Sequence, residues 1–214
     1  MRDCEFVQDY NKRMELMIAD FEKEGKVPKL LLHSCCAPCS SAVLERLTQH
    51  FEITIFYYNP NIEPKTEYDI RVKEQQRFIN EIDAKYPVSF LEGEYVPKRF
   101  HEAIKGKEMI PEGGSRCYEC YQLRLEETAK MAASQQYDYF TTTLSISPYK
   151  NAKWLNEIGQ KIAAEYEGLS YLYADFKKRN GYRRSIELSK EYGLYRQDYC
   201  GCVYSKKERM LQKK

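Results

Sequence analysis

This sequence of 214 residues contains no long run of apolar residues. A helix that crosses a bilayer needs about 18 or more such residues in a row, so we expect no membrane span. Residues 1–26 also lack the apolar core and the small-residue cleavage site of a secretory signal, because acidic residues recur throughout them. Internal repeats and low-complexity segments are absent as well. We therefore expect a globular, cytoplasmic protein.

The chain also has little excess charge of either sign. Its 34 Lys+Arg and 32 Asp+Glu give a formal charge of +2, which argues at first against a nucleic-acid partner. The total hides an asymmetry, because residues 177–214 hold twelve basic and four acidic residues and carry +8, which leaves −6 for residues 1–176. Such a basic segment suits nucleic-acid binding, although a solvated charged terminus has the same composition.

The composition supports one packed domain. Hydrophobic residues make up 43% and charged residues 31%, which excludes both a disordered tail and a coiled-coil rod. A chain of this length suits one domain with at most a small appendage. We predict a helical N-terminal extension over residues 1–28, an α/β domain over residues 29–204, and a basic C-terminal tail over residues 205–214.

Cysteine is the residue that the sequence has in excess. Eight cysteines without an export signal do not suggest disulfides, since a cytoplasm keeps thiols reduced. Apart from Cys4, which we take as incidental, they fall into three tight groups. These are Cys35, Cys36 and Cys39; Cys117 and Cys120; and Cys200 and Cys202. Clustered thiols in a reducing compartment indicate metal or redox chemistry.

Strand-like runs alternate with helix-like runs over the chain. Runs rich in apolar, β-branched and aromatic residues predict strands at 29–34, 52–60, 88–95, 137–146 and 170–176. Amphipathic runs predict helices at 5–24, 40–50 (capped by Ser40 or Ser41), 65–82, 97–106, 117–134, 147–168 (after a turn) and 181–193. This alternation is typical of βαβ units, and hence of a mostly parallel sheet flanked by helices on both faces.

The cysteine groups lie near predicted strand ends and helix starts. The segment HSCCAPCS (33–40) follows the first strand, and CYEC (117–120) begins a helix, where the positive end of the helix dipole favours thiolates. The segments 141–150 and 174–182 end two further strands. Because ligands bind at the carboxyl ends of parallel strands, we expect these four segments to form one cysteine-rich metal site.

The spacing of the thiols leaves several kinds of site open. Cys117 and Cys120 lie one helical turn apart, which suits zinc, an iron–sulfur cluster or a redox pair. The adjacent Cys35 and Cys36 can face one site only in a tight turn, which Pro38 favours. Adjacent cysteines are unusual in zinc knuckles. They are easier to accommodate around a cluster of several irons or around two neighbouring metals.

The segment Cys200-Gly201-Cys202 is too short for a standard zinc knuckle. The two thiols could close a small strained disulfide, which would be easily reduced, or bind a second metal. They could equally be incidental thiols beside a flexible glycine.

For several other residues, the sequence allows a structural role as well as a functional one. Five tyrosines interleave with the basic segment, as expected where bases stack and phosphates are neutralised: Tyr182, Tyr192, Tyr195, Tyr199 and Tyr204. His33 is expected in the core rather than as a ligand. Asp175 suits a ligand contact and a loop cap equally. A glycine-rich phosphate loop of the SGGxDS type is absent after the first strand, so ATP activation is not expected.

Several blocks together resemble one known family. The blocks are LLLHSCCAPCS, YYNPNIEP, EGGSRCYECYQLRLEETA, TTTLSISPYKN and FKKRNGYRRSIELSKEYGLYRQDYCGC. Over residues 29–204 the chain is similar to the cobalamin-independent epoxyqueuosine reductase family, QueH. The resemblance implies reduction of epoxyqueuosine to queuosine at the wobble position of tRNA, the last step of queuosine biosynthesis. It also implies an iron–sulfur cluster, no cobalamin, and a Rossmann-like fold of the adenine-nucleotide α-hydrolase (HUP) type.

The resemblance also implies roles for individual residues. Carried over by position, Cys35, Cys36, Cys117 and Cys120 would hold a 4Fe-4S cluster. Cys200 and Cys202 would be the catalytic redox pair or, with Cys39, ligands of an adjacent mononuclear iron. Phosphates of tRNA would be held by Lys177, Lys178, Arg179, Arg183 and Arg184. A low-potential electron donor is the other expected partner. A zinc-stabilised RNA-binding module and a thiol–disulfide oxidoreductase are the alternatives.

Overall fold

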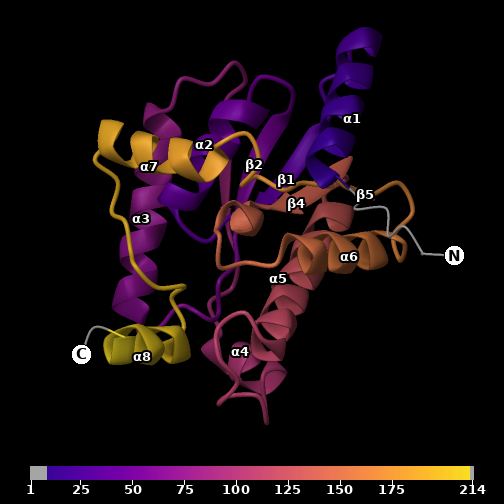
Figure 1. Ribbon diagram of the computed structural model, residues 1–214. Helices are drawn as coiled ribbons and strands as arrows, with labels where there is room; N and C mark the ends of the chain where they lie inside the picture. The colour runs from indigo at the N-terminus through magenta and orange to yellow at the C-terminus, as the bar shows by residue number, and fades with distance from the viewer. Residues whose placement is uncertain (1–8, 213–214) are drawn as a thin grey trace, which may run out of the picture.

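A five-stranded parallel sheet lies at the centre of the structure (Figure 1). The computed structural model describes residues 9–212, so Cys4 and the predicted helix start at residues 5–8 lie outside the described residues. The strands are β1 (Lys29–His33), β2 (Glu52–Tyr57), β3 (Ser89–Glu92), β4 (Tyr139–Thr142) and β5 (Ser170–Tyr171). Their order is β3-β2-β1-β4-β5, and every neighbouring pair is parallel. The predicted α/β fold is confirmed.

Helices cover both faces of this sheet. They are α1 (Tyr10–Glu24), α2 (Ala37–Leu47), α3 (Lys65–Glu81), α4 (Pro97–Ala103), α5 (Ser115–Ser134), α6 (Ala152–Ala163), α7 (Gly181–Glu191) and α8 (Val203–Gln212). In Figure 1, α2, α3 and α7 lie on one side of the sheet and α5 and α6 on the other. Within residues 9–212, no helix combines the length and the apolar character that a membrane span requires.

The central strand β1 shows how the sequence builds two cores. Successive side chains of a strand point to opposite faces of the sheet. Leu30 and Leu32 therefore pack in one core with α1, α2 and α7, whereas Leu31 packs in the other with α5 and α6. A strand buried on both faces needs a continuous apolar run, which is what the sequence has there.

The chain order reverses at β1, whose neighbours are β2 and β4. In open parallel sheets, ligands bind at such a point, beyond the carboxyl ends of the strands. The loop after β1 carries Cys35 and Cys36, and the loop after β4 leads to Lys150. The order of the strands thus brings these two loops to one edge of the sheet.

All five strands are shorter than predicted, β4 and β5 most of all. Beyond Thr142 the chain turns into a 3₁₀ helix (Thr143–Ile146), and the Thr142 hydroxyl accepts a hydrogen bond from the backbone N–H of Leu144. Beyond β5, the side chain of Asn156 bonds both the N–H and the carbonyl of Ala174. An amide side chain therefore satisfies the backbone groups of Ala174 in place of a strand partner.

Helix α2 begins earlier than predicted, at Ala37, directly after Cys36. Pro38 is favoured in the first turn of a helix, because it has no N–H to satisfy there. The hydroxyls of Ser40 and Ser41 donate to the carbonyls of Ala37 and Pro38 rather than capping the helix start, so the predicted serine cap is wrong. Cys39 therefore stands in the first turn of α2, next to Cys36.

Residues 205–212, predicted to lie in a basic tail, form most of helix α8. Glu208 of α8 forms an ion pair with Arg116 of α5 at 2.8 Å, and Arg116 is almost completely buried. The backbone N–H of Glu112 also donates to the Glu208 carboxylate. These contacts dock α8 against the start of α5, where Cys117 lies. The predicted domain boundaries themselves stay a prediction.

We predict that Gly181→Ala destabilises the fold. A Cβ at Gly181, the first residue of α7, would lie 1.9 Å from the backbone oxygen of Phe176, so the turn from 176 to 181 would have to move. Overpacking of this kind costs roughly 1–3 kcal/mol of unfolding free energy. Thermal denaturation measures the loss. The control Arg183→Ala, two residues further along α7 and highly exposed, should stay within about 0.5 kcal/mol of wild type; an equal loss in both variants would contradict the steric explanation.

Candidate functional site

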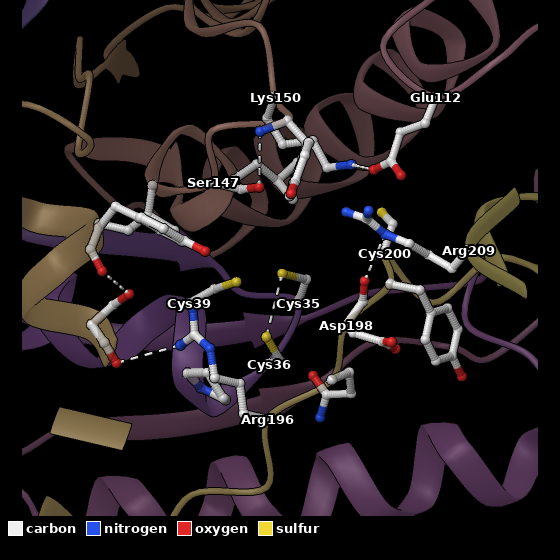
Figure 2. A pocket seen from close by; sticks show the side chains of 18 of the residues that line it. Cys35, Cys36, Cys39, Glu112, Ser147, Lys150, Arg196, Asp198, Cys200 and Arg209 are labelled. Atoms are coloured by element: carbon white, nitrogen blue, oxygen red, sulfur yellow. Dashed lines mark hydrogen bonds and ion pairs between the residues drawn. The ribbon is translucent and has the colours of Figure 1, made fainter. Parts of the chain in front are cut away.

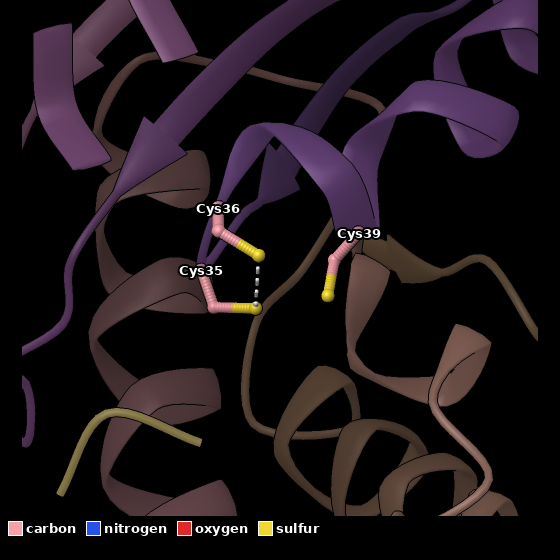
Figure 3. A group of neighbouring side chains, drawn as sticks. All are labelled: Cys35, Cys36 and Cys39. Atoms are coloured by element: carbon pink, nitrogen blue, oxygen red, sulfur yellow. Dashed lines mark hydrogen bonds between the residues drawn. The ribbon is translucent and has the colours of Figure 1, made fainter. Parts of the chain in front are cut away.

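Three thiols gather where β1 meets α2 (Figure 3). The sulfurs of Cys35, Cys36 and Cys39 all lie within 4.8 Å of one another, and those of Cys35 and Cys36 are 3.9 Å apart. The two adjacent cysteines do face one site, as the tight turn before Pro38 predicts. Sulfurs around one tetrahedral metal ion with bonds of about 2.3 Å lie roughly 3.8 Å apart. We call these residues the three-thiol group.

The charges of the three-thiol group suit a cation. Hydrogen bonds from the thiols of Cys36 and Cys39 hold the pKa of Cys35 well below its usual value, while the same contacts raise the pKa of the other two. Cys35 is therefore the thiol of the group that ionises most easily. A metal ion would allow all three thiols to ionise, because metal binding releases thiol protons.

The other four cysteines of the described chain line a small cavity between α4, α5 and α8. These are Cys117, Cys120, Cys200 and Cys202, and we call the space the four-thiol cavity. Cys117 and Cys120 lie in the first turns of α5, as predicted. Burial raises the pKa of Cys120 to about 12 and also raises that of Cys202. Neutral, buried thiols of this kind need a metal or a base nearby before they can react.

The loop that carries Cys200 and Cys202 is held in place by its backbone. Gly201 has a φ of +117°, and a Cβ there would lie 2.9 Å from Ile62, so a side chain would not fit. The Gly201 carbonyl accepts a hydrogen bond from the N–H of Glu63 at 3.1 Å. The buried guanidinium of Arg71 donates to the Cys200 carbonyl at 3.3 Å. The glycine thus allows the two cysteines to enter the cavity together.

Two buried cations lie among the thiols. Arg124 of α5 is 1% exposed; burial disfavours its charged form, but Cys120, Cys200 and Cys35 outweigh this and raise its pKa. Lys150 is 6% exposed and forms an ion pair with Glu112 at 2.6 Å. It lines the four-thiol cavity and also a second, larger cavity. The charge of Arg124 thus interacts with thiols of both groups.

A larger cavity of about 650 Å³ opens over the three-thiol group (Figure 2). Figure 2 shows Cys35 and Cys36 between Cys39 on one side and Cys200 with Arg209 on the other. Its other lining residues include Pro38, Arg71, Glu112, Leu144, Ile146, Ser147, Tyr149, Lys150, Tyr182, Ser185, Arg196, Gln197, Asp198, Tyr199 and Gln212. A cavity of this size has room for a nucleoside. The loops after β1 and β4, two of the four segments predicted to converge, meet here with the segment 196–200, which was not among them, whereas Cys117 and Cys120 line the other cavity.

Arginine–tyrosine pairs line this large cavity. The guanidinium of Arg209 lies 4.6 Å from the ring centre of Tyr149, and that of Arg196 lies 5.6 Å from the ring centre of Tyr182. Arg196 donates to Ser185 and Ser189, and Arg209 to the Asp198 carbonyl and Gln212. A hydrogen bond with Tyr149 and the charges of Glu112 and Asp198 raise the pKa of Arg209, so two carboxylates lie near it. Both guanidiniums face the cavity, where they can bind an anion.

The predicted phosphate-binding residues lie elsewhere. Arg184 bonds the carboxylates of Glu45 and Glu191, Arg179 bonds Glu15, and Arg183 bonds Glu187. Lys177 donates to the carbonyls of Ser145 and Lys150, and Lys178 is exposed. None of the five lines the large cavity. Their role in binding RNA stays a prediction.

His33 and Asp175 both have structural roles, as the sequence predicts for His33. His33 is completely buried, and burial lowers its pKa to about 3, so the ring is neutral. Its nitrogens contact the hydroxyl of Thr142 and the carbonyl of Tyr58, which leaves none for a metal. Asp175 accepts from the backbone N–H of Lys177 and pairs with its ammonium, so it caps its own loop.

Sequence reasoning missed Arg124, Lys150, Arg196 and Arg209 as site residues. Lys150 ends one of the strand-end segments quoted above, and Arg196 lies four residues before Cys200, so both carried a positional signal. Arg124 had none, because it stands among ordinary helix formers in α5. Arg209 lies in α8, which was not predicted.

The fold and the site define a Rossmann-like α/β protein whose cysteine-lined cavities lie at the carboxyl ends of its strands. The family model described as "Epoxyqueuosine reductase QueH" matches residues 30–208. The chain is 46% identical over 201 residues to the protein of that name from Streptococcus pyogenes serotype M1, covering 93% of this chain and 78% of the relative. It is 36% identical to that of Thermotoga maritima over 186 residues, covering 84% of this chain and 91% of the relative. The chain therefore belongs to the epoxyqueuosine reductase QueH family of enzymes.

Proposed function

We propose that this protein reduces epoxyqueuosine in tRNA to queuosine, the last step of queuosine biosynthesis, with an iron–sulfur cluster and an external low-potential electron donor. Family membership supports the reaction. The structural observation that carries the proposal is the placement of a cavity with room for a nucleoside directly over clustered thiols. Removal of the epoxide oxygen takes two electrons and two protons, breaks two C–O bonds, and yields an alkene and water.

The thiols fit an iron–sulfur cofactor. We propose that Cys35, Cys36, Cys117 and Cys120 hold a 4Fe-4S cluster, and that Cys200 and Cys202 either cycle as the catalytic redox pair or hold an adjacent iron together with Cys39. Thiolate ligands and buried cations that balance their charge are what such a cofactor requires. When bound, it supplies electrons one at a time, and an open iron site supplies a Lewis acid.

The chain's own contribution is positioning and charge. Lys150 Nζ lines both cavities, and Glu112 holds it in place. We propose that it donates a hydrogen bond to the epoxide oxygen and stabilises the negative charge that develops as the C–O bond breaks. His33 is completely buried and both of its ring nitrogens have partners, so we propose water rather than His33 as the proton source. Arg196 and Arg209 are placed to hold phosphates at the cavity, with Tyr149 and Tyr182 beside the bases.

Turnover of tRNA that contains epoxyqueuosine tests the proposal. Wild-type protein, prepared without oxygen and given a strong electron donor, should convert the modified nucleoside to queuosine, as measured by nucleoside mass spectrometry. Lys150→Met should keep its iron and lose roughly 10²–10³ in kcat, the usual effect of removing one such donor. Lys153→Met, an exposed lysine of α6, is the matched control and should keep full activity.

Two outcomes would count against this function. Iron-loaded wild-type protein that leaves epoxyqueuosine unchanged would rule out the reaction. A Lys150→Met variant with the same kcat as Lys153→Met would leave the reaction standing but remove Lys150 from it.

A further inference from the structure

Unpartnered polar atoms surround the four-thiol cavity. The side chains of Asn61, Tyr121 and Arg124 line it, and each is about 1% exposed. The hydroxyl of Tyr121, both amide atoms of Asn61 and Nη2 of Arg124 have no hydrogen-bond partner among residues 9–212. Buried polar groups are nearly always satisfied, and a buried unpaired cation is especially unfavourable. Several such groups around one small space indicate a polar or anionic ligand.

The thiols of the chain do not satisfy these groups. Arg124 donates through Nε to the Cys120 carbonyl at 3.1 Å and through Nη1 to Asn59 at 3.5 Å. Its Nη2 has no hydrogen-bond acceptor among residues 9–212. Lys150 and Arg116 also line the cavity, and each already has a glutamate partner. Arg124 has no carboxylate partner within the described residues. Its charge therefore needs a counter-ion at the thiols.

We propose that Tyr121, Asn61 and Arg124 are positioning residues that donate hydrogen bonds to the sulfur atoms of the iron–sulfur cluster on the side held by Cys117 and Cys120 of the four-thiol cavity, and so raise its reduction potential. This inference rests on the cofactor of the proposed function. Thiolate and sulfide sulfurs are hydrogen-bond acceptors, and they accept more strongly once the cluster has taken up an electron. Donors that favour the reduced form shift the potential upwards.

The three donors come from two elements that hold them rigidly. Tyr121 and Arg124 lie on α5, one turn apart and on the helix that carries Cys117 and Cys120. Asn61 lies in the loop after β2, two residues from Glu63, which bonds the Gly201 carbonyl. One helix thus supplies two thiols and two donors to the same cavity. The loop supplies the third donor from the side of the CGC segment.

The test compares Tyr121→Phe with Tyr118→Phe. Tyr118 is also on α5 but packs against Trp154 and does not line the cavity. Metal-free Tyr121→Phe should melt at the same temperature as wild type or higher, because it loses a buried hydroxyl that has no partner. Iron-loaded Tyr121→Phe should keep wild-type iron content and show a more negative reduction potential in a titration followed by EPR. Tyr118→Phe should match wild type in potential.

Arg124→Lys and Lys130→Gln extend the test to charge. Arg124→Lys keeps the positive charge but loses the second arm of the guanidinium, so its potential should also shift downwards. Lys130→Gln removes an exposed positive charge from the same helix and should leave the potential unchanged. If Arg124→Lys does not fold, Tyr121→Phe decides the matter alone.

Unchanged potentials in Tyr121→Phe at full iron content would overturn the inference, as would a metal-free Tyr121→Phe that melts lower than wild type. Wild-type protein that takes up no iron would overturn it at once. None of these measurements uses tRNA. A protein that shows the shifts and yet leaves epoxyqueuosine unchanged would refute the proposed reaction and leave this inference intact.

Discussion

Replacing Cys117 with alanine is expected to abolish both iron binding and turnover. Wild-type protein purified without oxygen should be brown and hold about four or five irons per chain if the cofactor is a 4Fe-4S cluster with an adjacent iron. Cys117 is a cluster ligand in the proposed set, and it lies in the four-thiol cavity. Loss of a ligand should lower turnover at least roughly 100-fold, since even outer contacts of metal sites can cost that much.

Iron analysis, the visible spectrum and turnover are measured on the same samples. Cys4→Ala is the control, because Cys4 lies outside the three cysteine groups, and it should match wild type. Cys39→Ala separates the proposed roles: it should keep about four irons and lose the adjacent one if Cys39 serves only that site. A Cys117→Ala variant with full iron and full turnover would show that the ligand assignment is wrong. A colourless wild-type protein that holds only zinc would favour the RNA-binding alternative.

Replacing both Arg196 and Arg209 with glutamine is expected to weaken tRNA binding strongly. Both guanidiniums line the large cavity, and the hydrogen bonds they donate within residues 9–212 go to uncharged oxygens, so they can also bind phosphates. Each lost phosphate contact lowers the salt dependence of the binding constant by about one unit on a log–log plot. The double variant should therefore have a slope shallower by about 1–2 units, measured by tRNA binding between low and moderate salt.

The comparison variant is Lys178→Gln with Arg183→Gln, which also removes two positive charges. These residues belong to the phosphate-binding set that the sequence predicts, but neither lines the cavity. Arg183 also has Glu187 as its partner. We expect this variant to change the salt slope less than Arg196→Gln with Arg209→Gln does. A larger change of the salt slope in Lys178→Gln with Arg183→Gln would instead place the RNA interface at residues 177–184. Equal iron content in both variants would exclude misfolding as the cause of the difference.

The parts of the fold that sequence predicts well are those with long local patterns. The helix over 65–82 and the helix that carries Cys117 and Cys120 were found to within a few residues, because their apolar spacing and helix formers act locally. The segment 170–176 was predicted as one strand, yet Asn156 binds the backbone of Ala174, and only Ser170–Tyr171 form β5. No local pattern encodes that competition.

The site shows the same limit. Sequence reasoning brought the thiols to one edge of the sheet, because chain order and strand ends determine that. It placed Cys39 in one group with Cys35 and Cys36, but it could not show that the three sulfurs meet, since that depends on α2 beginning at Ala37. It named Arg184 for phosphate, and one of the carboxylates that Arg184 pairs with is Glu45, which lies 139 residues away in the sequence. Charge can be counted from sequence, whereas its neutralisation by distant residues cannot.

The position of Cys200, Cys202 and α8 in the chain has a consequence for assembly of the protein. All five strands and α5 are synthesised before this segment, so Cys35, Cys36, Cys39, Cys117 and Cys120 can be in place while the four-thiol cavity still lacks its outer wall. The ion pair between Glu208 and Arg116 forms only when α8 docks. Closure of the cavity therefore has to wait for the last helix of the described chain, and until α8 docks, Cys117 and Cys120 lack this outer wall.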